Sequence, residues 1–151
     1  MKSPYRKLAL VVAINALIMY FVTYARIETF DHFHFNINAV YMALMMAAPM
    51  VILVLLVMGG VFPNGILNAS LYVGAAIVFM FAIALARHQI AVGNIQFLRS
   101  MIPHQSSAIL MCQEAEITDP DTIVLCRQIL RTQRDEIEQM EKLLARLRLR
   151  P

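Results

Sequence analysis

The stretch AVYMALMMAAPMVILVLLVMGG, Ala39–Gly60, decides the fold of this chain. It contains no charged residue and is long enough, as a helix, to cross a hydrocarbon core of about 30 Å. Inside a bilayer only a helix or a closed barrel satisfies its own backbone polar groups, so we expect a transmembrane helix here. Pro49 lies inside the stretch and should kink it, because its ring removes one backbone donor.

Two further uncharged runs of similar length flank this stretch, Leu8–Ala25 and Ile66–Ala86. Together the three runs predict three transmembrane helices, consistent with a chain that is 60% hydrophobic. The first run could resemble a signal peptide, because basic residues precede it. Its length and the two spans that follow favour an uncleaved helix.

Basic residues near the spans are balanced, three on each side: Lys2, Arg6 and Lys7 against Arg26, Arg87 and Arg99. Since the first helix usually sets the orientation, we expect the N-terminus to be cytoplasmic. Three spans then place the second half of the chain outside, in a bacterial periplasm or its equivalent. The predicted location is the bacterial inner membrane, with lipid as a partner.

The second half of the chain is amphipathic and carries seventeen of the charged residues, from Arg87 onward. After a connector, residues 87–96, it predicts helices over about 97–116 and 120–147, joined by the turn TDPD. Asp119 suits an N-cap and Pro120 the first helical position. We therefore expect an all-α protein with two parts: a transmembrane region with its connector, residues 1–96, and an extracytoplasmic helical hairpin, residues 97–151.

Each predicted hairpin helix has an apolar side. In the first helix this side is expected to consist of Phe97, Met101, His104, Ala108, Met111 and Ala115. The second has a heptad-like stripe: Ile123, Cys126, Leu130, Gln133, Ile137, Met140, Leu144 and Leu147. One hairpin should not bury so long a stripe alone, so we expect two copies to form a four-helix bundle.

A candidate metal site lies within MIPHQSSAILMC, residues 101–112. Met101, His104 and Met111 share one helical face, and Met140 lies on the stripe expected to face it. Thioether and imidazole ligands suit Cu(I). The alternative is that this face is simply packed, with His104 a hydrogen-bonded residue and the methionines part of the core.

Two other pairs could carry chemistry. His32 and His34 form a second candidate metal pair, in a loop predicted to face the same side as the hairpin. Cys112 and Cys126 lie at similar distances from the turn, so a disulfide is geometrically feasible, and an oxidising compartment would favour it. Buried free thiols and thiolate metal ligands are the alternatives.

The sequence has no nucleophile with a base, no phosphate loop and no interleaved basic patch, so we expect neither an enzyme nor a nucleic-acid-binding protein.

The segment from Gln96 to Met140 resembles a bacterial ferritin-like family of long-uncharacterised function, with the signature M-I-P-H-H-x-x-A-I-x-M. YMALMMAAPMV, Tyr41–Val51, is similar to the second span of its membrane branch. Some periplasmic relatives are implicated in copper binding and tolerance, which implies Met101, His104 and Met111 as ligands, with Met140 nearby. One departure is that Gln105 stands where the family usually has a second histidine.

The sequence thus predicts a membrane-anchored, homodimeric copper-binding protein involved in metal tolerance or handling. The competing hypothesis is an interaction module without metal, in which the hairpin of a dimeric membrane protein docks a partner.

Overall fold

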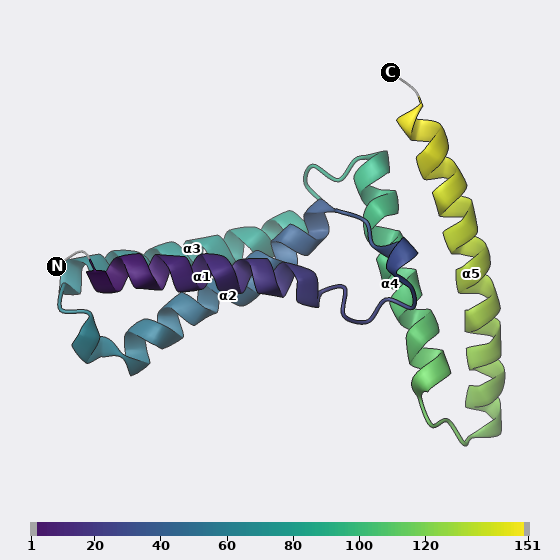
Figure 1. Cartoon of the computed structure of the whole chain (residues 1–151), viewed down its shortest axis with the longest axis horizontal. Helices are drawn as coiled ribbons and strands as arrows, with labels where there is room; N and C mark the ends of the chain where they lie inside the picture. Colours follow the sequence, from purple (N-terminus) through teal and green to yellow (C-terminus); the bar gives the residue numbers. More distant parts are fainter. Residues whose placement is uncertain (1–2, 150–151) are drawn as a thin grey trace. The chain divides into compact units, whose positions relative to one another are not determined.

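The computed structural model describes residues 3–149, and these are helical with no strand (Figure 1). Three long helices come first: α1 (Ser3–Val22), α2 (Ile37–Val57) and α3 (Gly65–Arg87). All three are long and apolar enough to span a membrane, as predicted. Helices α4 (Asn94–Glu114) and α5 (Pro120–Arg148) follow, and short 3-10 turns occur at η1 (Phe30–His32) and η2 (Gly59–Val61). The predicted all-α class is confirmed.

The helix boundaries follow local chemistry. Asn64 caps α3, since its side chain accepts a hydrogen bond from the backbone of Leu67 at 3.0 Å. Asp119 caps α5 in the same way, accepting from the backbone of Thr122 at 2.8 Å, and Pro120 occupies the first turn. The Asp119 cap and the Pro120 position agree with the sequence prediction. The hydrogen bonds from Thr122 lower the pKa of the Asp119 carboxyl.

The chain forms two compact units. One consists of Met1–Thr23 with Asn38–Ile90, and the other of Tyr24–Ile37 with Ala91–Pro151. This division differs in two respects from the predicted one after residue 96: the segment before α2 belongs to the unit with the hairpin, and so do residues 91–96. We call this segment, Tyr24–Ile37, the docking loop.

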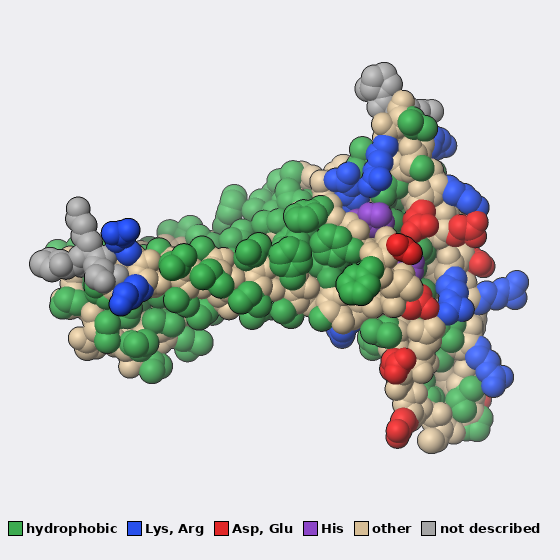
Figure 2. Space-filling model, in the orientation of Figure 1, with side chains coloured by type: hydrophobic (Ala, Val, Ile, Leu, Met, Phe, Trp, Pro, Cys, Tyr) green, Lys and Arg blue, Asp and Glu red, His purple; other side chains and the backbone are tan. Residues whose placement is uncertain are grey.

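The first unit contains α1, α2 and α3. Leu8, Leu55 and Phe62 are its buried contacts at the end where α1 begins. Tyr5 strengthens this end, because its hydroxyl lies 2.9 Å from Asn68 Oδ1 and accepts from the backbone N–H of Asn64 at 3.1 Å. Most of the remaining surface of these helices is apolar, in contrast to the charged hairpin (Figure 2).

The second unit is built on the antiparallel pair α4 and α5. Its buried core comprises Leu98, Ile102, Ile109, Ile137 and Leu144. The predicted α5 stripe is confirmed as the side of α5 that packs inward. It packs against α4 of the same chain, where Ile137 and Leu144 are buried and the other stripe residues are partly buried.

The predicted buried face of α4 was wrong. His104, Phe97 and Met111 are exposed, while Ile102 and Ile109 have no exposed area. The inward residues are the β-branched and branched aliphatic side chains at spacings of four and seven. These apolar side chains are buried in the hairpin core, whereas His104 and Met111 face outward.

Candidate metal-binding face of α4 and the loop that supports it

Helix α4 has three sides with different neighbours. One side packs on α5 through Leu98, Ile102 and Ile109. A second side, near Ser106 and Arg99, receives the docking loop. The third side carries Phe97, His104 and Met111, which are exposed at helical spacings of seven, with Met101 and Ala108 beside them. We call this third side the open face.

Pro103 explains part of how the docking loop is held. It lies inside α4 and lacks the N–H that would bond to the carbonyl of Arg99 in a regular helix. The buried side chain of Asn36 donates to this carbonyl at 3.4 Å, and also to the hydroxyl of Tyr24 at 2.7 Å. The carbonyl of Arg99, which Pro103 leaves without its usual donor, therefore accepts a hydrogen bond from Asn36, a residue distant in sequence.

Ser106 is the second anchor of the docking loop. Its side chain is fully buried, and its Oγ accepts from the backbone N–H of Glu28 at 2.7 Å. Its Oγ also lies 2.8 Å from His32 Nδ1, to which the hydroxyl donates when His32 carries its proton on Nε2. Further along the loop, the backbone N–H of Ile37 donates to Gln96 Oε1 at 3.0 Å.

The carboxylate of Glu28 links both hairpin helices. Its Oε1 accepts from Gln113 on α4 at 2.9 Å and forms an ion pair with Arg134 on α5 at 3.1 Å. Because the Arg134 side chain is largely exposed, the ion pair contributes little energy alone. The three-way contact nevertheless fixes the loop against the pair of helices.

His34 lies at the other end of the docking loop. Burial lowers the pKa of its imidazole, helped by Arg148, Arg99 and His32 and opposed by Glu141. Its Nε2 is buried and has no hydrogen-bond partner among residues 3–149. Burial and the neighbouring cationic groups therefore favour the neutral form of the His34 imidazole.

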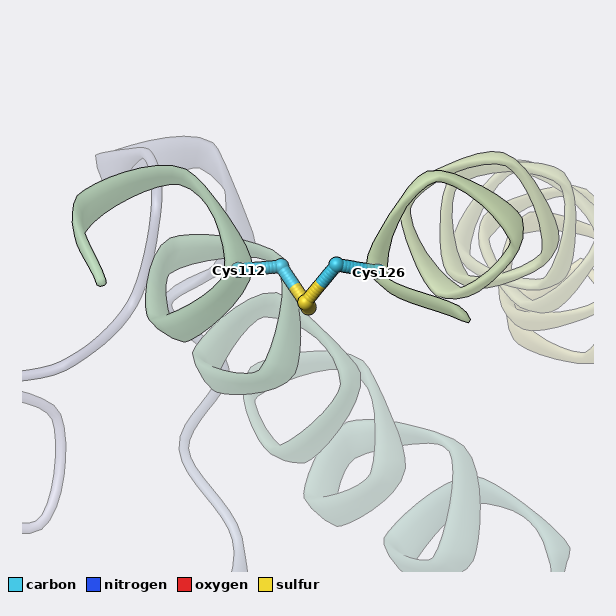
Figure 3. Close-up of a disulfide and its surroundings, with 2 residues drawn as sticks. All are labelled: Cys112 and Cys126. Atoms are coloured by element: carbon cyan, nitrogen blue, oxygen red, sulfur yellow. A yellow bond between two sulfur atoms is a disulfide. The ribbon is translucent and has the colours of Figure 1, made fainter. Parts of the chain in front are cut away.

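Cys112 and Cys126 join the two helices near the turn as a disulfide, with their Cα atoms 5.5 Å apart (Figure 3). The sulfurs are thus bonded to each other rather than available as metal ligands. The bond closes the hairpin at the end away from Leu98 and Leu144.

The candidate metal-binding residues lie at separate positions in the structure. His104 and Met111 are on the open face, and Met101 lies half-buried at its edge. Met140 packs against the hairpin core, between α4 and α5. His32 contacts Ser106, which is two residues from His104 and therefore about 200° around the helix. The structure does not bring the His32–His34 pair together with His104.

Gln105, the departure from the family signature, is engaged elsewhere. Its side chain donates to Glu136 on α5 at 2.5 Å. It therefore helps to join the hairpin helices and does not point across the open face. In residues 3–149 no group of three or more His, Cys, Asp or Glu side chains is arranged to hold a metal.

Sequence reasoning missed the residues that hold the docking loop, above all Asn36, Ser106 and Glu28. One signal was available: Pro103 inside a helix must leave the carbonyl of Arg99 without its usual partner. This signal does not indicate which distant residue supplies the partner.

A comparison with protein-family models found a match to part of the chain. Residues 81–144 match the family described as Domain of unknown function (DUF305), which is ferritin-like in type. The match covers the end of α3, all of α4 and most of α5. A search of curated proteins and a search of solved structures found no match.

Proposed function

We propose that the protein is a membrane-anchored Cu(I)-binding protein that acts in copper tolerance or handling, by binding and not by catalysis. The observation that carries the proposal is the open face of α4. It presents the imidazole of His104 with the thioethers of Met101 and Met111 on a side of the helix that neither α5 nor the docking loop covers. Soft thioether and imidazole ligands favour Cu(I).

A single open face offers only one imidazole, so the site needs a second copy of the chain. In a two-fold arrangement the same face meets itself, and each ligand is supplied twice. Ala108 lies one turn from His104, and its small side chain leaves space for close approach. Phe97 is 50% exposed and Met111 is 57% exposed, and the same contact would bury their apolar surface.

This route to a dimer differs from a bundle driven by the α5 stripe. The stripe already packs within the chain, so the partner contact is assigned to α4. The disulfide and the docking loop hold α4 in place from its other sides. A metal site benefits from this, because rigid ligands lose little freedom on binding.

Binding of Cu(I) by the purified full chain, under conditions that keep its disulfide intact, tests the proposal. We expect less than one Cu(I) per chain, near one for every two chains. His104→Ala should weaken binding by more than about tenfold, the range that even supporting residues of metal sites contribute. His88→Ala is the matched control, since His88 is exposed but lies beyond α3, and it should leave binding unchanged.

The methionines allow a second matched comparison. Met101→Leu with Met111→Leu removes two thioethers from the open face at nearly constant volume and should weaken copper binding. Met140→Leu removes one from the hairpin core and should have no effect. Equal binding by wild type and His104→Ala, or binding by neither, would contradict the proposal.

The competing function is an interaction module whose open face docks a protein and binds no metal. The exposure of Phe97 and Met111 favours it, because both are large apolar side chains on one face. The same copper measurement separates the two functions: an interaction module binds no Cu(I), while substitutions at Phe97 and Met111 still change its association.

A further inference from the structure

The first unit contains a groove that the copper hypothesis does not use. It lies where α1 begins and α2 ends, and has a volume of about 500 Å³, within the range of small-molecule sites. Its lining comes from the first turns of α1 and from the last turns of α2 with η2: Pro4, Lys7, Leu8, Val11, Val54, Met58, Val61 and Phe62.

The walls of this groove are held in place. Leu8 and Phe62 are buried, and the rings of Tyr5 and Phe62 pack with centroids 5.2 Å apart. Asn68 donates to the backbone carbonyl of Phe62 at 2.8 Å, while the Tyr5 hydroxyl lies 2.9 Å from Asn68 Oδ1. These contacts fix the start of α1 against the segment that carries Phe62, so the groove exists before a ligand arrives.

The lining has a strong chemical asymmetry. Seven of its eight residues are apolar, and Lys7 is the one charged residue among them. The ammonium of Lys7 is exposed, so it can reach an anion at the rim while its methylene stem borders the apolar interior. Blue side chains mark this N-terminal end of an otherwise green surface in Figure 2.

We propose that the groove binds one anionic phospholipid of the membrane, with an acyl chain against the apolar lining and the headgroup phosphate on Lys7. Pro4 and Phe62 line the groove near the helix ends, where the headgroup would lie. Val11 and Val54 line it further along α1 and α2. From Pro4 to Val11 a helix rises about 10 Å, enough for the upper part of an acyl chain. A basic residue near the membrane surface selects anionic headgroups.

The test uses the full chain in bilayer nanodiscs of mixed phosphatidylglycerol and phosphatidylcholine, followed by native mass spectrometry to count retained lipids. Wild type should retain one phosphatidylglycerol more firmly than any phosphatidylcholine. Lys7→Ala should reduce this retention about fivefold, the effect expected for one basic residue at a membrane surface. Arg6→Ala is the matched control, because Arg6 is exposed beside Lys7 but does not line the groove.

A second pair tests the apolar part. Val54→Trp fills the groove and should release the retained lipid, whereas Val57→Trp, at an exposed position outside the lining, should not. Equal loss in Lys7→Ala and Arg6→Ala would show only diffuse attraction and overturn the proposal. Unchanged retention in Lys7→Ala would overturn it as well, and so would equal retention of both lipids by wild type.

Discussion

Two sides of α4 differ sharply in how their chemistry is used. On the side of the docking loop, polar groups are buried and paired: Ser106 with Glu28 and His32, and the carbonyl of Arg99 with Asn36. On the open face, His104 and Met111 are exposed, and Met101 is half-buried at the edge. Buried polar groups of the first kind fix structure. Accessible soft ligands of the second kind are suited to binding.

The largest expected effect separates the packed side of α4 from the open face. Ile109→Ala removes a fully buried side chain and should lower the free energy of unfolding by about 2–5 kcal/mol. Met111→Ala, two residues away but exposed, should change it by no more than about 0.5 kcal/mol. Denaturant unfolding of the full chain in detergent measures both. Similar losses in the two variants would mean that the open face is covered within the chain.

The disulfide should give the next largest effect. Replacing Cys112 and Cys126 together with serine removes a covalent closure that spans 14 positions of sequence. The free energy of unfolding should fall by about 3 kcal/mol, because the unfolded chain regains the freedom of an open loop. The same unfolding measurement, with and without a reductant on wild type, should give matching results. If reduction left the free energy of unfolding of the wild type unchanged, the disulfide would not stabilise the fold.

The anchor of the docking loop should give an intermediate effect. Ser106→Ala leaves the backbone N–H of Glu28 without its acceptor and should cost about 1–3 kcal/mol. Hydrogen exchange at the amide of Glu28 should quicken in this variant. Ser107→Ala is the matched control, since the neighbouring serine lies about 100° further around α4. Equally fast exchange in both variants would contradict the assigned role of Ser106.

The smallest effect concerns pH. Burial lowers the pKa of His34 in the folded chain below its ordinary value of 6.5, so the unfolded chain binds the proton more readily. Stability from His34 is therefore complete above pH 6.5 and declines as the pH falls below it. The decline should be shallow, because the imidazole is partly solvated. Unfolding midpoints between pH 7.5 and 5.5 should show a steeper loss for wild type than for His34→Asn.

Much of the fold could be predicted because its signals are local. Uncharged runs of sufficient length identified the three long helices, and the Asp119–Pro120 pair marked the start of α5. The stripe on α5 was identified because a mostly apolar position recurs every three or four residues, about once per helical turn. In α4 two stripes compete. The predicted stripe contains His104 and Met111, but the more hydrophobic stripe, with Ile102 and Ile109, is the one buried against α5.

The candidate site was predictable only as a set of residues on one helix. Met101, His104 and Met111 follow from spacing, but the place of Met140 depended on which face of α4 meets α5. The docking loop was not foreseeable, because contacts such as Asn36 with Arg99 join residues far apart in sequence. Long-range pairing of this kind leaves no periodic trace.

The central claim is that the open face of α4 becomes a Cu(I) site when two chains meet. The most direct test is native mass spectrometry of the purified protein, with its disulfide intact, titrated with Cu(I). The account predicts a species of two chains with one copper ion, which His104→Ala abolishes and His88→Ala preserves. A copper-loaded single chain, or a two-chain species that takes up no copper, would contradict the claim.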